Sequence, residues 1–361
     1  MNNSTPKING TWLYAAYQYE YTAYLTLTLI IAISGCLLSG TFLAVLLRRK
    51  SLFSSSRYLI ISQTIAEMLL NGFFLPSASI GAYAAEIDGS GESVFFNTTF
   101  CVHHTFFFVV TVAVSMWGLF ALALNRFCAI NIVQPHLYQR FTSPAVQCVQ
   151  IILICTLSVI INLYNYMPNA VATAVKPLRQ CYSRPSQWYA VRQVIGTYLP
   201  LALTAALYIL IALKLLLEKR WQNHRQVKTT TPQSNKPSHA DARRINLAKI
   251  LCITATVHSV TFLLYPLARS FQGGEVLDPV TPLWFRSVFN LGLLSSPISF
   301  FIMSRDCQQD VIRLFRCKKI AEGDYSGSHT HSDHHSQPGV NKRQTPASSQ
   351  QTKHKANQPA V

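Results

Sequence analysis

Seven long runs of apolar residues constrain this chain more than any other feature of its sequence. The hydrocarbon core of a bilayer is about 30 Å thick, and a helix with a rise of about 1.5 Å per residue crosses it in roughly 20 residues. Lipid offers no partner for backbone N–H and C=O groups, so such runs should be helical. The runs predict an all-α fold, a seven-transmembrane helix bundle. They are Tyr21–Leu47, Tyr58–Tyr83, Cys101–Ile130, Ala145–Met167, Val191–Leu217, Ile245–Phe271 and Leu283–Met303.

The placement of charge agrees with a membrane protein and predicts its orientation. Only 12% of the 361 residues are charged, about half the fraction usual in soluble domains. The net charge of +17 would suit a nucleic-acid partner, but the basic residues gather after the first run, between the fifth and sixth runs, and after the seventh. These segments lie on one side of the membrane, as the positive-inside rule expects of the cytoplasm. We therefore expect membrane lipids and not nucleic acid around this chain.

The orientation divides the chain into four predicted parts. Residues 1–20 form an extracellular glycosylated N-terminus, and residues 21–304 form the seven-helix transmembrane domain. Residues 305–317 form a short amphipathic cytoplasmic helix, and residues 318–361 form a disordered cytoplasmic tail. We expect no cleavable signal peptide, because the N-terminus lacks a charged start followed by an apolar stretch. Glycosylation sequons, all on the predicted outside, begin at Asn2, Asn3, Asn9 and Asn97.

Three of the nine cysteines stand out by position. Cys101 opens the third run and Cys181 lies in the loop before the fifth, both on the oxidising outside, so a disulfide between them is expected. Cys317 ends an amphipathic stretch beside the inner membrane surface and is a candidate for palmitoylation, with an unmodified thiol as an equal alternative.

Short motifs recur in a fixed order along the predicted helices. Ala66–Leu69 lies in the second run, and Asn125–Phe127 closes the third. Pro200 and Tyr208 lie eight residues apart in the fifth run. Leu263–Pro266 lies in the sixth run, and Ser296–Phe300 ends the seventh. With these spacings the chain from Tyr21 to Cys317 resembles the rhodopsin-like (class A) family of G-protein-coupled receptors.

The resemblance implies a receptor in the plasma membrane whose partners are an extracellular ligand, a heterotrimeric G protein and arrestin. The residues that match the family's activation and coupling motifs are Asn125, Arg126, Phe127, Tyr208, Pro266, Pro297 and Phe300. Several depart from the family pattern. Asn125 replaces the acid of Asp-Arg-Tyr, so we expect a weaker resting latch on Arg126 and some basal activity. The alternative is that Arg126 contacts lipid headgroups.

Two further sets of residues match family sites inside the bundle. Glu67, Ser115 and Ser296 match an internal sodium site, and a carboxylate with two hydroxyls suits a hard cation; the alternative is a carboxyl group kept protonated by burial. Pro200, Pro266 and Pro297 each remove a backbone hydrogen bond and predict kinks.

The ligand is expected to be anionic. Residues 1–20 are too few for a folded binding domain, so helices and outer loops must bind it. An amine receptor of the family would need an acid where this chain has Phe108, and a retinal pigment would need a lysine where it has Asn290. These two residues disfavour an amine and retinal as ligands. Three of the predicted ligand-binding residues, Arg192, Arg269 and Arg286, are arginines, and arginine binds carboxylate and phosphate bidentately. The alternative is that these three arginines point outward or pair with Glu275 and Asp278. The predicted ligand-binding residues are His104, Phe108, Val112, Arg192, Leu267, Arg269, Arg286 and Asn290.

Other classes of protein fit less well. A transporter would usually show repeated halves, and the sequence has no internal repeat. An enzyme within the membrane would need a catalytic constellation, so we expect no enzymatic activity and no cofactor. The histidines between His329 and His335 lie in the polar tail without a fold to position them, which argues against a metal site. An odorant-like chemosensory receptor remains an alternative within the receptor class.

Overall fold

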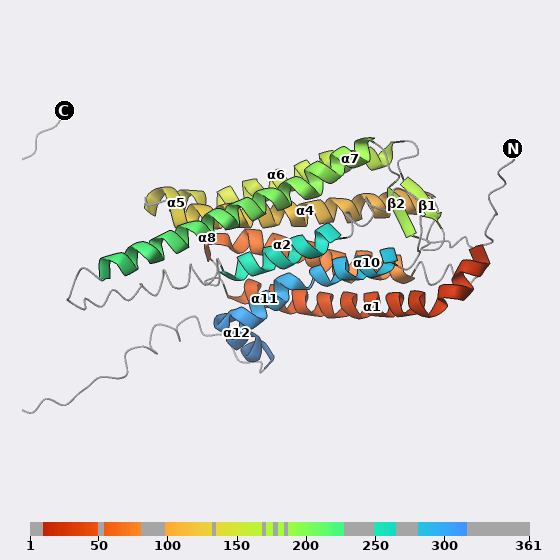
Figure 1. Ribbon diagram of the computed structural model, residues 1–361, viewed down its shortest axis with the longest axis horizontal. Helices are drawn as coiled ribbons and strands as arrows, with labels where there is room; N and C mark the ends of the chain where they lie inside the picture. The colour runs from red at the N-terminus through yellow and green to blue at the C-terminus, as the bar shows by residue number, and fades with distance from the viewer. Residues whose placement is uncertain are drawn as a thin grey trace, which may run out of the picture. The chain divides into compact units, whose positions relative to one another are not determined.

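The structure is a computed structural model that describes residues 10–49, 54–80, 98–131, 135–167, 171–175, 180–183, 187–226, 249–264 and 281–315. Among these residues, five helical segments are long and apolar enough to cross a membrane. A sixth span is a bent pair of helices, and the apolar helix Lys249–Leu264 is shorter. These segments correspond in order to the seven predicted runs, and the sixth run is described only in part. The helices run side by side in Figure 1.

The elements follow the chain in a simple order. Helices α1 (Gly10–Arg48), α2 (Arg57–Leu69), α4 (Thr98–Asn131) and α6 (Pro144–Asn162) contribute to the first four spans. Helices α7 (Gln187–Gln193) and α8 (Leu199–Gln226) form the fifth, and α10 (Thr281–Gly292) with α11 (Ser295–Met303) forms the seventh. The short elements are α5 (Pro135–Phe141), α12 (Arg305–Phe315), the 3-10 turns Ser54–Ser56 and Leu163–Tyr166, and the strands β1 (Val171–Val175) and β2 (Gln180–Ser183).

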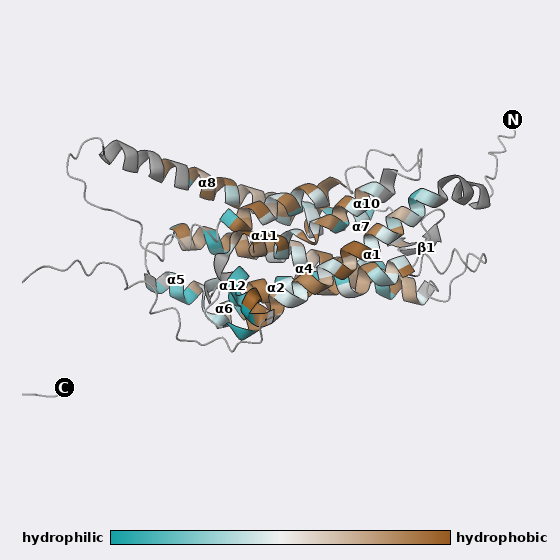
Figure 2. Ribbon diagram, turned by 90° about the horizontal axis from the view of Figure 1, so that it is seen from below, coloured by the Kyte–Doolittle hydropathy of each residue, from teal (hydrophilic) through white to brown (hydrophobic). Residues whose placement is uncertain are grey.

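The bundle packs around α4. This helix contacts α2, α6 and α8, while α1 contacts α2 and α10. Apolar side chains such as Ile152, Leu153 and Ile160 of α6 are exposed, as lipid-facing residues should be. Figure 2 shows hydrophobic residues along the bundle and hydrophilic residues in α5 and α12. Two apolar clusters fill the interior, one with Phe42, Leu46, Leu122, Ile250 and Phe300, the other with Leu70, Met116, Phe262 and Leu293.

Three prolines follow irregular turns in these helices. Proline has no N–H group and so cannot donate to the carbonyl four residues earlier. Pro76 follows the π-helical segment Leu70–Phe74, and Pro200 follows the π-helical segment Val194–Tyr198. Before Pro297 the chain turns between α10 and α11, and the segments on either side differ in direction by 45°. The irregular backbone thus lies where the sequence removes a helical hydrogen bond.

A small hairpin departs from the all-helical pattern. Strands β1 and β2 pair antiparallel, with Val171 opposite Ser183 and Val175 opposite Gln180. Both strands contact α4. The apolar runs did not predict this hairpin, because it lies in a loop.

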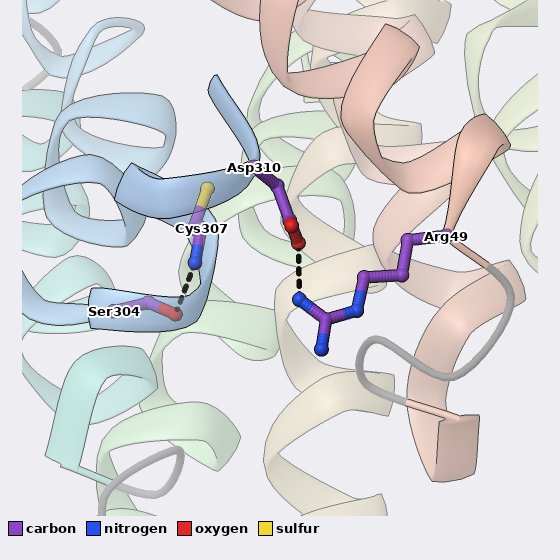
Figure 3. Close-up of polar contacts among 4 residues, drawn as sticks. All are labelled: Arg49, Ser304, Cys307 and Asp310. Carbon is purple, nitrogen blue, oxygen red and sulfur yellow. Dashed lines mark hydrogen bonds and ion pairs between the residues drawn. The ribbon is translucent and has the colours of Figure 1, made fainter. Parts of the chain in front are cut away.

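Helix α12 is fastened to the end of α1. Ser304 caps the helix, since its Oγ accepts from the backbone N of Cys307 at 3.2 Å. Arg49 donates to and pairs with Asp310, whose side chain is fully buried. Figure 3 shows this ion pair between the residue that directly follows α1 and the middle of α12. The pair anchors the first helix to the segment that follows the seventh.

We predict that Arg49→Gln lowers the thermal unfolding midpoint of the purified protein by several degrees. It leaves the buried carboxylate of Asp310 without its cation, which costs about 3 kcal/mol. The double variant Arg49→Gln/Asp310→Asn should recover part of the loss, because no charge is left buried. Arg48→Gln is the matched control, since Arg48 is exposed. Equal midpoints for Arg49→Gln and Arg48→Gln would show that the ion pair does not stabilise the fold.

Candidate ligand site and signalling site

The predicted outer end of the bundle carries the expected disulfide. Cys101, near the start of α4, is bonded to Cys181 in β2, and their Cα atoms are 5.2 Å apart. The bond ties the hairpin to the third span. The segment before the fifth span is therefore held against the end of the bundle where the predicted ligand residues lie.

His104 is the centre of the polar and aromatic contacts just below this disulfide. Its Nε2 lies 2.9 Å from Ser77 Oγ. The rings of Phe74 and Phe100 lie 5.6 and 5.5 Å from the imidazole. Arg286 of α10 is close enough to interact electrostatically with His104. The structure thus brings together polar groups from the second, third and seventh spans.

The other predicted third-span residues lie deeper along α4. Phe108 and Val112 pack, half-buried, against the apolar cluster that contains Met116. The ring of Phe108 lies 6.1 Å from that of Phe74. Asn290 of α10 is fully buried. Phe108 and Val112 thus extend an apolar surface along α4 beyond the polar group around His104.

Arg192 of α7 lies within the bundle and does not extend from it. The residue is 8% exposed. Its guanidinium carbon lies 4.8 Å from the ring centre of Tyr189 and 5.7 Å from that of Tyr164, both within cation–π range. It also donates to Gln193 Oε1 at 3.2 Å. Burial argues against the outward-pointing alternative for this arginine.

A polar centre joins the second, third and seventh spans in the bundle interior. Glu67 and Ser115 are both buried, and Gln63 Nε2 donates to Glu67 Oε1 at 3.0 Å and to Ser115 Oγ at 2.7 Å. Ser296 of α11 is close enough to Glu67 to interact with its carboxyl group. The residues of the predicted ion site are therefore neighbours, with Gln63 between two of them. Cation binding itself stays a prediction at this point.

His258 adds a contact that the sequence reading did not assign. It lies in the helix Lys249–Leu264, where its Nδ1 is 3.1 Å from Ser295 Oγ and its ring stacks on Phe262 at 4.3 Å. Because Ser295 precedes Ser296, this contact links the sixth span to the polar centre. The sequence feature that could have indicated this contact is a histidine inside an apolar run, because such a side chain needs a polar partner.

At the opposite end of α4, Asn125 and Arg126 turn toward the start of α2. Asn125 Nδ2 donates to the carbonyl of Ser55 at 2.8 Å and to Ser56 Oγ at 2.9 Å. Arg126 donates to both serine hydroxyls and is 2% exposed. A side chain so buried among protein groups does not fit the lipid-headgroup alternative. The sequence reading missed Ser55 and Ser56, which carry no motif of their own.

The remaining coupling residues surround this contact. Tyr208 of α8 is buried and close enough to Arg126 to interact electrostatically. Phe300 stacks on Phe42 of α1 at 4.8 Å, and Phe127 packs against the same apolar cluster. Pro297 is buried in α11. The predicted residues outside the described ranges are Pro266, Leu267, Arg269, Cys317, Asn2, Asn3, Asn9 and Asn97.

The chain has the arrangement of a seven-helix membrane receptor. A disulfide-tied hairpin lies at one end of the bundle, a buried arginine at the other, and a polar centre between them. The family model described as 7 transmembrane receptor (rhodopsin family) matches residues 40–296. The chain belongs to this family. It is a multi-pass membrane protein and a non-enzymatic class A G-protein-coupled receptor.

Solved structures agree with this fold. The chain is similar to squid rhodopsin, with a TM-score of 0.68 and 14% sequence identity, over 82% of this chain and 85% of that chain. At this identity the similarity shows the architecture alone. A comparison with curated proteins found no match.

We predict that Cys181→Ser lowers the free energy of unfolding of the receptor by about 2–4 kcal/mol, the usual contribution of a disulfide that closes a long loop. Thermal unfolding of the purified protein measures the loss, and a reducing agent should reproduce it in the wild type. Cys155→Ser is the matched control, because Cys155 is an exposed free cysteine. Unchanged stability after reduction would contradict a structural role for the bond.

Proposed function

We propose that this receptor lies in the plasma membrane with its N-terminus outside, binds an anionic small molecule or peptide at its outer end, and signals to heterotrimeric G proteins. The observation that supports this ligand class most is the proximity of Arg286 to His104, across α10 and α4. Both side chains can donate hydrogen bonds to an anion. Neither is an acid that would favour an amine.

The chemistry of these donors suits a carboxylate, sulfate or phosphate group. A guanidinium offers a planar fork of N–H groups that matches two oxygens of such an anion. Ser77 adds a hydroxyl beside the imidazole. The aromatic rings of Phe74, Phe100 and Phe108 exclude water on the apolar side, and attraction between charges is stronger where water is excluded.

Arg192 provides a second cation for the same proposal. It is buried against two tyrosine rings, so a ligand that reached it would meet a charge already stripped of most of its water. Val112 and Asn290 are proposed as further ligand contacts, and Leu267 and Arg269, which lie outside the described residues, are proposed from the sequence alone.

A screen of acidic metabolites and peptides, read as cAMP or calcium, tests the ligand class. Against a ligand found this way, Arg286→Ala and Arg192→Ala should each raise the half-maximal concentration about 10- to 100-fold, because a charge-assisted hydrogen bond contributes about 1.5–3 kcal/mol. Arg140→Ala, in the short helix α5 at the other end, is the matched control. Unchanged potency in both arginine variants would leave their pairing with Glu275 and Asp278 as the better reading.

The inner end favours some signalling without ligand. In the family the third-helix arginine rests on a neighbouring acid, whereas here Asn125 is neutral and Arg126 donates to the hydroxyls of Ser55 and Ser56. Such contacts contribute less than an ion pair with the same geometry. We therefore propose that Ser56 is part of the resting latch.

Ser56→Ala should raise ligand-free signalling several-fold, because it removes an acceptor for both Asn125 and Arg126 and each lost hydrogen bond costs about 1 kcal/mol. The readout is basal cAMP or calcium in cells matched for receptor expression. Ser34→Ala is the control, since Ser34 bonds only within its own helix in the described contacts. A wild type and a Ser56→Ala variant that both signal no more than mock-transfected cells would argue against the proposed latch.

A further inference from the structure

The polar centre is organised by a side chain that no motif assigns a role. Gln63 lies one helical turn before Glu67 in α2 and faces Ser115 of α4. Its side chain is 3% exposed. Its Nε2 carries two N–H groups, and the two acceptors lie at 3.0 and 2.7 Å, both normal hydrogen-bond distances.

Membership of the rhodopsin family implies a sodium ion among Glu67, Ser115 and Ser296. A hard cation needs several oxygen ligands converging on one point. Here the point between the Glu67 carboxyl group and the Ser115 hydroxyl is taken by an amide nitrogen, and the hydrogens of that group would face a cation. The residues present therefore do not fit a bound sodium ion.

Gly118 explains why the glutamine can adopt this position. A Cβ atom at residue 118 would lie 2.5 Å from Gln63 Oε1, which is closer than nonbonded atoms approach. The missing side chain on α4 makes room for the carbonyl end of the amide. With Oε1 against Gly118, the Nε2 end is directed at Glu67 and Ser115.

We propose that the Gln63 amide permanently takes the place of the sodium ion in this receptor. It joins the second and third spans with two hydrogen bonds and brings no net charge. Sodium then neither stabilises the fold nor regulates the receptor through Glu67. This inference does not depend on the identity of the ligand, because it concerns the receptor without one.

The test compares thermal unfolding of the full-length receptor in sodium, potassium and N-methyl-D-glucamine chloride at equal ionic strength, so that general screening is the same in each. The wild type should unfold at the same temperature in all three. Gln63→Ala removes the amide and should gain a sodium-specific rise in midpoint of about 2 °C or more. The further change Glu67→Gln should abolish that gain.

Two more variants serve as an independent test and as a control. Gly118→Ala should also gain sodium sensitivity, because its new methyl group displaces the end of a flexible side chain and not the backbone. Gln147→Ala removes another buried glutamine, which accepts from the backbone N of Tyr58, and should lower the midpoint equally in every salt.

Two results would overturn the proposal. A saturable, sodium-specific rise in the wild type would mean that the cation binds in spite of the amide. Insensitivity to sodium in the wild type, Gln63→Ala and Gly118→Ala alike would mean that Gln63 is not what excludes the ion.

Discussion

The hydrogen bonds from Gln63 to Glu67 and Ser115 are the contact on which the rest of the bundle interior depends. Lipid cannot satisfy a polar group, so a carboxyl group in the middle of a membrane helix must find its partners within the protein. Glu67 accepts a hydrogen bond from Gln63 of its own helix and lies near Ser296 of α11. Ser295 then leads to His258 of the sixth span. These contacts run through residues of the second, third, sixth and seventh spans.

The same physical solution recurs at the inner end. Arg126 is a fixed charge held among protein groups, and its described partners are hydroxyls of the segment before α2. Asn125 stands where the family has an acid and donates to that same segment. Gln147 also reaches it, donating to the carbonyls of Ser55 and Thr142. At the polar centre and at the inner end, neutral donors and acceptors therefore make the contacts that a cation or a carboxylate makes in the family pattern.

The sequence predicted the features that depend on a single residue or run, and missed those that depend on partners. Apolar length is enough to predict the spans, and a missing N–H at Pro200 and Pro297 is enough to predict irregular backbone. Cys101 and Cys181 could be paired from their shared side of the membrane. Gln63 could not be found, because a polar residue in an apolar run shows that it needs a partner but not which one. Ser55 and Ser56 could not be found because they lie between two runs and carry no motif of their own. The β1–β2 hairpin was missed because strand pairing in a loop leaves no hydropathy signal. Arg192 was predicted as a ligand residue, but its contacts with Tyr164 and Tyr189 are visible only in three dimensions.

Uncharged side chains thus take the place of a cation beside Glu67 and of an acid beside Arg126. A high-resolution experimental structure determined in sodium tests this most directly at one point, the space between Glu67 and Ser115. We expect the Gln63 amide there, with its nitrogen at hydrogen-bond distance from both residues. The contradicting result is a Gln63 side chain turned away from that space, together with a compact density peak about 2.4 Å from the surrounding oxygen atoms, the distance expected of a bound hard cation.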